Sequence, residues 1–122
     1  MRNFIIKRLK SIGIACRGAY LLMITETSIK VQLVIAVVVS VAGFYVKLSA
    51  TEWILQTLAI AVVMGVEGLN TAIEKTTDFI HPDHNNKIGF IKDIAAGAVF
   101  ITALAAIVIG CIIYIPKLCQ IN

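Results

Sequence analysis

Three long stretches that are almost free of charged side chains constrain the fold more than any other feature. They cover residues 31–48, 53–73 and 94–115 of a chain of 122 residues. The hydrocarbon core of a bilayer is about 30 Å thick, so a helix needs about 17 to 25 mainly apolar residues to cross it. A transmembrane barrel would instead show alternating segments of about ten residues separated by turns, and these stretches do not alternate. We therefore predict an all-α membrane protein with three transmembrane helices.

The composition supports this fold class. The chain is 59% apolar and 15% charged, with a mean hydropathy of +0.92. Soluble domains are nearer 45 to 50% apolar and about 25% charged. The composition excludes a soluble α/β enzyme, a secreted disulfide scaffold and a disordered chain, but it does not exclude a membrane enzyme. The three cysteines are expected in three different environments, so no disulfide is predicted.

The basic residues around the three stretches predict the orientation in the membrane. Nine of the 11 precede the first stretch or lie between the second and the third: Arg2, Lys7, Arg8, Lys10, Arg17, Lys30, Lys75, Lys87 and Lys92. Segments rich in Lys and Arg stay in the cytoplasm. The N-terminus and the second connection are therefore predicted to be cytoplasmic, with the C-terminus outside.

Residues 3–24 combine apolar positions with basic ones and form a fourth predicted element. This pattern is compatible with a helix that lies on the cytoplasmic membrane surface with its bases near anionic headgroups. A plain anchor that obeys the positive-inside rule is the alternative. The net charge of +4 does not indicate nucleic acid binding, because basic and aromatic residues are not interleaved.

A polar stripe runs along the end of the second stretch, in the segment VEGLNTAIEKTTD at residues 66–78. Glu67, Asn70, Thr71, Glu74 and Asp78 are spaced i, i+3, i+4, i+7 and i+11, which puts them on one face of a helix. An ionisable group at membrane depth is costly and usually functional. Glu67 is therefore a candidate site residue, and the alternative is a protonated glutamate that hydrogen-bonds a neighbouring helix.

Other charged residues lie at the same predicted membrane boundary. Glu26 precedes the first stretch, and Lys92 and Asp93 open the third. Carboxylates near an interface can bind a hard divalent cation, and a deeper carboxylate can take a proton from a hydroxyl. Together with a lysine for phosphate charge, the pattern indicates phosphoryl transfer from a nucleotide to a membrane-embedded alcohol.

The common nucleotide and metal motifs are absent. Gly13 and Gly18 have the Walker spacing, but Ala19 and Tyr20 follow where Lys and Ser or Thr are required. The HPDH segment at residues 81–84 contains two histidines, but its proline favours a loop and no third soft ligand is nearby. A structural or nucleotide-bordering role for this loop is favoured over a zinc site.

The segments VEGLNTAIEKTTDFI, HPDHN and KDIAAGAV resemble the signature region of the small bacterial membrane-integral diacylglycerol kinases and of the related undecaprenol kinases. The resemblance covers the whole chain, residues 1–122, as a single lipid kinase domain in the bacterial cytoplasmic membrane. It implies ATP- and Mg²⁺-dependent transfer of the γ-phosphoryl group to the primary hydroxyl of diacylglycerol, giving phosphatidic acid. Undecaprenol is the alternative acceptor. It also implies a homotrimer, and the small residues at 95–98 would allow close helix packing.

The resemblance also assigns roles to residues. Glu67 matches the general base, and Asn70 matches the asparagine that orients this carboxylate or the lipid. Glu26 and Glu74 match the acids that hold Mg²⁺ against the ATP phosphates. Further positions match residues around the nucleotide: Lys7, Ile14, Asp83, His84, Asn85, Lys92 and Asp93. The implied reaction is a direct in-line transfer without a phosphoenzyme.

Three positions in the opening helix depart from the family pattern. Some members have a tyrosine and a serine where this chain has Ile14 and Ala15, so the corresponding side-chain hydrogen bonds are not expected. Lys7 stands where some relatives have arginine, which would replace a bidentate phosphate contact by a point charge. The resemblance is therefore weaker in this helix than at Glu67, Asn70 and Glu74.

Two other classes of protein fit parts of the pattern. A small proton-coupled exporter has similar length and hydropathy, but it usually has four spans and a glutamate well inside the first. A non-enzymatic membrane scaffold would leave the aligned acids and Lys92 without a role. ATP turnover that depends on added lipid would separate the kinase from both alternatives.

Overall fold

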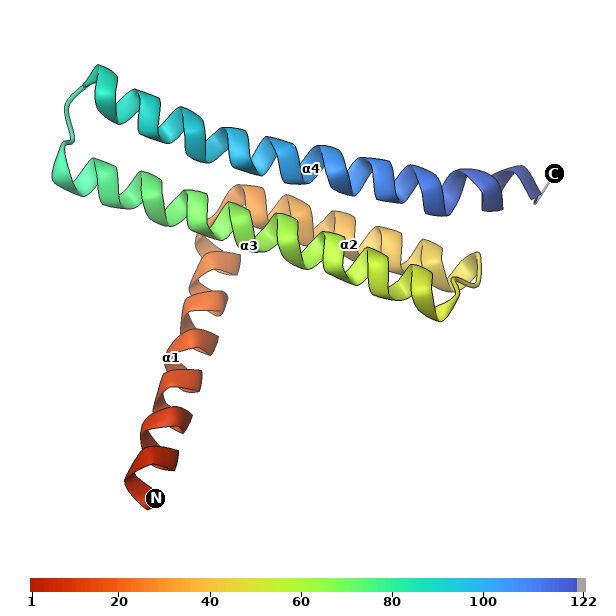
Figure 1. The fold of residues 1–122 in the computed structure, drawn as a ribbon, viewed down its shortest axis with the longest axis horizontal. Helices are drawn as coiled ribbons and strands as arrows, with labels where there is room; N and C mark the ends of the chain where they lie inside the picture. The colour runs from red at the N-terminus through yellow and green to blue at the C-terminus, as the bar shows by residue number, and fades with distance from the viewer. Residues whose placement is uncertain (121–122) are drawn as a thin grey trace.

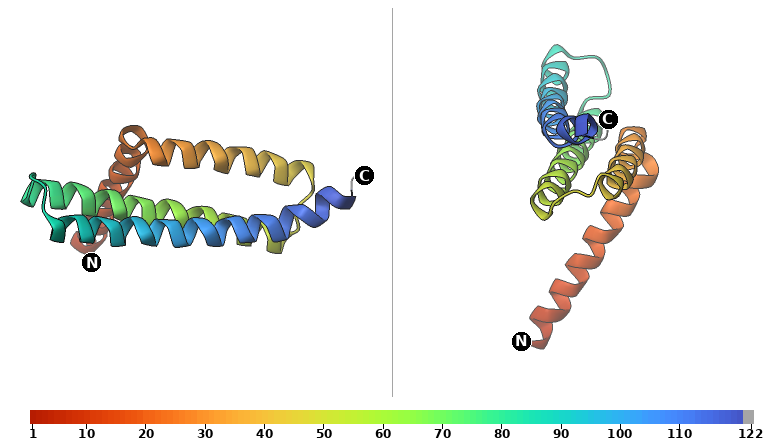
Figure 2. Two further views of the ribbon diagram at one scale, coloured as in Figure 1. Left: turned by 90° about the horizontal axis from the view of Figure 1, so that it is seen from above. Right: turned by 90° about the vertical axis from the view of Figure 1, so that its right-hand side faces the viewer.

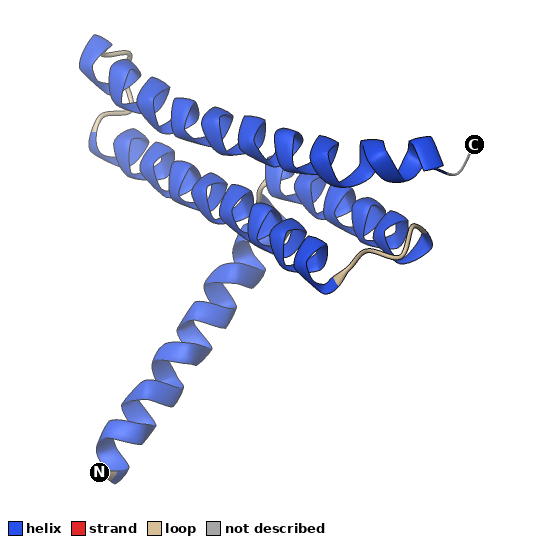
Figure 3. Ribbon diagram, turned by 45° about the vertical axis from the view of Figure 1, so that its right-hand side comes forward, coloured by secondary structure: helices blue, strands red, loops and turns tan. Residues whose placement is uncertain are grey.

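The computed structural model describes residues 1–120, and these form four helices joined by short loops (Figures 1 and 3). The helices are α1 (Arg2–Thr25), α2 (Thr27–Tyr45), α3 (Ala50–Ile80) and α4 (Asn86–Gln120). Helices α3 and α4 pack against each other along most of their length, and α2 packs on α3. The described chain thus confirms the all-α fold class.

Three of the helices, α2, α3 and α4, are long and apolar enough to cross a membrane. Helix α2 has 19 residues, a length of about 28 Å, which is close to the minimum for a bilayer. Helices α3 and α4 have 31 and 35 residues, about 46 and 52 Å, so both are longer than the hydrocarbon core. The surplus length of both helices adjoins the 81–85 loop and holds the polar residues between positions 74 and 93.

Helix α4 runs beyond the third apolar stretch at residues 94–115 and continues through Pro116 to Gln120. Proline lacks the amide hydrogen that would bond to the carbonyl four residues earlier, which weakens a helix but does not always end it. Lys117, in the last turn, donates to Glu52 of α3 at 3.1 Å. This ion pair between the helices helps to hold the segment beyond the proline against α3.

Hydrogen bonds join α2, α3 and α4 at the end of the bundle away from the 81–85 loop. The Tyr114 hydroxyl lies 2.6 Å from the Val39 carbonyl oxygen and 2.6 Å from the side-chain amide of Gln56. A hydroxyl has one proton, so both contacts are satisfied when Tyr114 donates to Val39 and accepts from the Gln56 amide nitrogen. This junction sets the register in which α3 faces α4.

Helix α1 departs from the bundle at a single residue. Glu26, between α1 and α2, is extended with φ −97° and ψ 119°, and Figures 1 and 2 show α1 projecting away from the other helices. Every residue from Met1 to Leu21 is exposed, including large apolar side chains such as Phe4 and Leu9. The location of α1 on the membrane surface stays a prediction.

Candidate functional site

The polar stripe of α3 faces α4. Glu67 lies 11 residues after Gln56 and 11 residues before Asp78, and 11 residues are close to three helical turns. Gln56 contacts Tyr114 and Asp78 contacts Lys92, and both partners belong to α4. Glu67 therefore faces α4 as well, and only 8% of its surface is exposed. The candidate base lies in the helix interface rather than on an open face.

Asn70 and Glu74 continue the stripe toward the 81–85 loop. The Asn70 amide nitrogen donates to Glu74 Oε1 at 3.2 Å. Asn70 is itself buried, and its Oδ1 atom has no hydrogen-bond partner within residues 1–120. The structure thus has Asn70 orienting Glu74, whereas no hydrogen bond from Asn70 to Glu67 occurs in the described part of the chain. The free Oδ1 can accept a hydrogen bond from a hydroxyl group of a ligand.

Glu26 is bound to α3 by an ion pair. Lys75 Nζ lies 3.0 Å from Glu26 Oε1, and the Thr25 hydroxyl donates to the same oxygen at 3.2 Å. The hydrogen bond from Lys75 holds the pKa of Glu26 below its ordinary value of 4.5. The first of the two predicted magnesium ligands is therefore fixed against the helix that carries the second, Glu74.

The depressed pKa of Glu26 predicts a pH-dependent contribution to stability. The contribution of the ion pair is present above the ordinary pKa and is lost as the pH falls through the lowered pKa, below 4.5. At pH 7 the variant Lys75→Met should melt at a lower temperature than the unchanged chain in detergent, and this difference should close below pH 4.5. Thermal melts of both proteins across the pH range test this expectation. A difference that stays constant down to pH 3 would contradict it.

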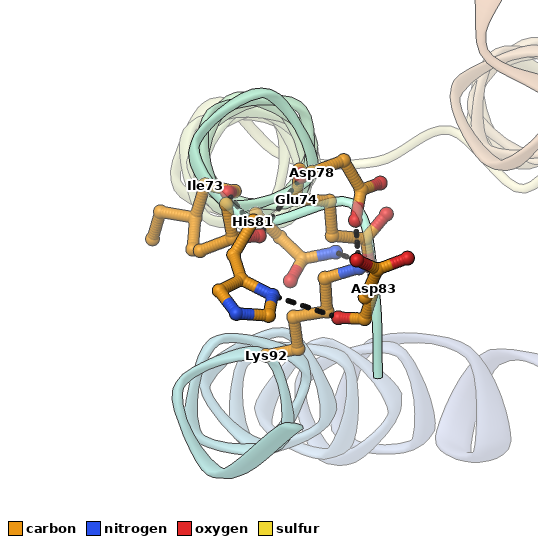
Figure 4. A network of polar contacts seen from close by, with 8 residues as sticks. Ile73, Glu74, Asp78, His81, Asp83 and Lys92 are labelled. Carbon is orange, nitrogen blue, oxygen red and sulfur yellow. Dashed lines mark hydrogen bonds and ion pairs between the residues drawn. The ribbon is translucent and has the colours of Figure 1, made fainter. Parts of the chain in front are cut away.

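Asp78 and Lys92 form an ion pair between α3 and α4 (Figure 4). The Lys92 side chain is 33% exposed, and its ammonium group has three donor hydrogens, so it can bind a further anion while it contacts Asp78. The spacing in the sequence placed Asp78 on the polar stripe and indicated no partner for it. In the structure it is the residue that positions Lys92, the predicted phosphate ligand.

The 81–85 loop is short and its polar groups are partly used to hold its shape. The ring nitrogen Nδ1 of His81 lies 3.0 Å from the Asp83 carbonyl oxygen (Figure 4). Asn85 Oδ1 accepts from the backbone nitrogens of Lys87 and Ile88 at 2.9 and 3.3 Å, which caps the start of α4. Asn85 therefore has a structural role, in addition to the nucleotide contact that the resemblance implies. Asp83 and His84 are exposed, as is Asp93, and their predicted nucleotide contacts stay predictions.

Lys7 and Ile14 do not lie near the polar stripe. Both belong to the exposed part of α1 that projects away from α3 (Figure 2). The structure thus brings together Glu67, Asn70 and Glu74 on α3, with Glu26 and Lys92 attached from the flanking helices. It does not bring the two α1 positions to the same place.

Glu26 and Glu74 offer carboxylate oxygens, the type of ligand that Mg²⁺ takes when it is bound together with a nucleotide. Within residues 1–120 no group of three or more His, Cys, Asp or Glu side chains could hold a metal by itself. Mg²⁺ at nucleotide sites usually takes only one or two carboxylates, and phosphate oxygens and waters complete its shell. Glu26 and Glu74 each use one carboxylate oxygen, Oε1, in the contacts above. Their second oxygens are available for such an ion.

Gln32, a residue of α2, was not among the predicted site residues. Its Oε1 atom is buried without a hydrogen-bond partner in the part of the chain that the structure describes. It lines a groove of about 260 Å³ among α2, α3 and α4, whose other walls include Val63, Met64 and Ala103. Val63 and Met64 precede Glu67 by one turn. The sequence does contain an indication of this position, because Gln32 is one of few polar residues in the first apolar stretch.

Comparisons with known proteins identify the family of the chain. Residues 13–114 match the sequence profile of the family described as prokaryotic diacylglycerol kinase. The undecaprenol kinase of Bacillus subtilis (strain 168) is 38% identical over 117 residues, which cover 96% of this chain and 95% of that protein. The diacylglycerol kinase of Escherichia coli (strain K12) is 28% identical over 105 residues, 86% of each chain. The diacylglycerol kinase of Synechocystis sp. is 30% identical over 111 residues, 90% of this chain and 63% of that protein. The chain therefore belongs to the prokaryotic diacylglycerol kinase family, a family of membrane lipid kinases.

Proposed function

We propose that this protein transfers the γ-phosphoryl group of ATP to the primary hydroxyl of a membrane lipid alcohol. The observation that carries the proposal is the line of polar groups on the α4-facing side of α3. It begins at the buried Glu67 and continues through Asn70 and Glu74 to Asp78, which contacts Lys92. The proposed base, Glu67, therefore lies on the same face of α3 as the proposed metal ligand Glu74 and as Asp78, the partner of the proposed phosphate ligand, and both are nearer the end of the helix. Neither an exporter nor a scaffold explains this line or the family membership.

Glu67 is the proposed general base. The apolar groove with Gln32 lies one turn from it along α3, so a lipid in the bilayer can bring its hydroxyl to the carboxylate without leaving the apolar phase. Glu67 takes the proton of this hydroxyl while the oxygen attacks the γ-phosphorus in line and the bond to ADP breaks. The unpartnered Oδ1 of Asn70 can accept a hydrogen bond from a donor group of the lipid head.

Lys92, Glu26 and Glu74 are the proposed ligands of the nucleotide phosphates and their metal. Lys92 contacts the phosphates with the ammonium hydrogens that Asp78 leaves free. Glu26 and Glu74 would hold Mg²⁺ through their unused carboxylate oxygens. When bound, this ion neutralises charge that develops on the β- and γ-phosphates. Lys7, Ile14, Asp83, His84 and Asp93 are proposed to contact the rest of the nucleotide, as the family resemblance implies.

The proposed setting is the bacterial cytoplasmic membrane, with the N-terminus and the 81–85 loop in the cytoplasm, where ATP is available. The distribution of basic residues supports this orientation. A homotrimer is the proposed assembly, because one chain leaves Glu74 and Asp78 exposed at their outer side. The small residues at 95–98 would permit close approach of a neighbouring helix.

Undecaprenol is the acceptor that the comparisons favour. The relative with 38% identity is an undecaprenol kinase, whereas the diacylglycerol kinases are 28 and 30% identical. The sequence taken alone put diacylglycerol first, and no side chain in the groove distinguishes the two lipids. Both present one primary hydroxyl to the same base. We therefore propose undecaprenol first and keep diacylglycerol, for which the family is described, as the second candidate.

Side-by-side turnover of the two lipids tests the proposed acceptor. The purified chain in mixed micelles with ATP and Mg²⁺ should phosphorylate undecaprenol with a kcat/KM at least about tenfold above that for diacylglycerol, a difference of about 1.4 kcal/mol in transition-state stabilisation. The variant Glu67→Gln serves as the blank. A reversed ratio would make diacylglycerol the substrate. ADP release that is independent of both lipids would contradict the kinase proposal.

A further inference from the structure

Leu22 of α1 packs on Gly68 of α3, the residue next to the candidate base. A Cβ atom added to Gly68 would lie 2.9 Å from Leu22 Cδ2 and 3.9 Å from Leu22 Cδ1. At the first distance the end of the leucine side chain would have to shift, so Leu22 fills the space that the missing side chain of Gly68 leaves open. Leu22 is also the one residue of α1 that is partly buried. The Leu22–Gly68 pair is thus the place where α1 rests on α3.

A second contact lies one turn further along the chain. Glu26 follows Leu22 by four residues, and its partner Lys75 follows Gly68 by seven, so both pairs lie on one side of α3. Between α1 and α2 the chain is extended at Glu26 alone. With so short a connection, the direction of α1 depends on these two contacts. They also flank the stripe, since Gly68 adjoins Glu67 and Lys75 adjoins Glu74.

The part of α1 that precedes Leu22 is long and projects away from the other helices. Lys7 lies 15 residues before Leu22 in the same helix, a distance of about 22 Å, so a rotation of about 10° at Leu22 moves Lys7 by about 4 Å. No residue before Leu22 is buried by the rest of the described chain. A change of side-chain size at the Leu22–Gly68 contact would therefore be amplified at the far end of α1.

We propose that the Leu22–Gly68 contact is a positioning contact that sets the angle of α1 and so places Lys7 and Ile14 relative to a nucleotide bound at Glu74 and Lys92. This inference rests on the proposed function. Neither residue touches the reacting atoms. Their effect on the reaction runs through α1, and it should appear in nucleotide binding more than in lipid binding.

Variants that enlarge the side chain at position 68, alone or together with a smaller side chain at position 22, test the proposal. Gly68→Leu should raise the KM for MgATP at least about tenfold, because shifts of about 1 Å in reacting or binding groups can cost about 10²-fold. The KM for undecaprenol should change much less. The double variant Leu22→Ala with Gly68→Leu brings the combined volume to within one methyl group of the original, and it should regain most of the lost affinity for MgATP. Gly65→Leu is the matched control, because Gly65 lies one turn earlier on α3 with nothing within 4 Å of an added Cβ.

Three results would overturn the positioning role. These are an unchanged KM for MgATP in Gly68→Leu, an equal effect of Gly65→Leu, and a double variant no better than Gly68→Leu alone. The contact itself is tested without activity, by oxidation of Leu22→Cys with Gly68→Cys in a chain whose three natural cysteines are replaced by serine. Loss of both free thiols supports the contact, and thiols that stay reactive overturn it. Absence of lipid-dependent turnover in the unchanged chain would instead contradict the proposed function, and the role of α1 in it, while the thiol result stands by itself.

Discussion

Glu67→Gln is expected to lower lipid phosphorylation by about 10³-fold while ATP binding stays within about twofold of the unchanged chain. General base catalysis contributes about 10² to 10⁴-fold, and glutamine cannot accept the proton of the lipid hydroxyl. The two side chains have nearly the same size and shape. The packing of this buried position against α4 should therefore be preserved, and the loss should fall on the chemical step.

The separation between turnover and ATP binding follows from the contacts of the site. Glu74 is hydrogen-bonded to Asn70, and Lys92 is paired with Asp78. None of these contacts uses the Glu67 carboxylate. The steady-state rate at saturating lipid measures the effect on turnover. Equilibrium binding of MgATP to the same preparation measures the effect on ATP binding.

Glu52→Gln is the matched control for this prediction. Glu52 lies on the same helix as Glu67 but near its other end, where it contacts Lys117 and caps α3 through Ser49. The Glu52 and Lys117 side chains are 26% and 23% exposed, and pairs that solvent reaches contribute about 0 to 1 kcal/mol. The turnover of Glu52→Gln should therefore be close to that of the unchanged chain. If Glu67→Gln keeps near-normal turnover, the base assignment is wrong.

Glu74→Gln is expected to weaken Mg²⁺-dependent ATP binding by at least about tenfold, or about 1.4 kcal/mol. The substitution removes one of two proposed carboxylate ligands and keeps a side chain that can still accept the hydrogen bond from Asn70. Magnesium prefers charged oxygen ligands, so the neutral amide is a poor replacement. Binding of ATP measured against Mg²⁺ concentration should show a higher half-saturation point.

The two variants serve as controls for each other. Raised Mg²⁺ should restore part of the activity of Glu74→Gln, because its defect is in metal binding. The same treatment should leave Glu67→Gln inactive, because no concentration of metal replaces the base. A Glu74→Gln protein with an unchanged requirement for Mg²⁺ would contradict the metal assignment.

Local periodicity was sufficient for several parts of the site. The spacing of Glu67, Asn70 and Glu74 puts them on one helical face wherever that helix lies, and the structure has them on one face. Asn70 nevertheless donates its amide nitrogen to Glu74. The spacing could not distinguish this contact from one with Glu67, because both glutamates lie about one turn from Asn70. Gln32 shows the same limit, since a lone polar residue in an apolar stretch does not reveal which groove it lines.

Pairing between helices was beyond the reach of periodicity. Lys75 was counted only among the residues that set topology, yet it binds Glu26. Asp78 was placed only on the stripe, with no partner, yet it forms an ion pair with Lys92. Such pairs depend on the register between helices, and here the junction of Tyr114 with Gln56 and Val39 contributes to that register. The contact of Leu22 with Gly68 likewise joins residues that are far apart in the chain.

The sequence by itself determined that the chain is a helical membrane protein with three helices apolar enough to span a bilayer, and that its acidic stripe lies on one helical face. The length of an apolar stretch and the period of a helix are local properties, so both can be read directly from the sequence of 122 residues. Only the tertiary structure decided that the stripe faces α4, that Lys75 binds Glu26 and Lys92 binds Asp78, and that Leu22 of α1 packs on Gly68 of α3. These facts arise from the packing of side chains that are far apart in the chain, and the pattern within any one helix does not contain them.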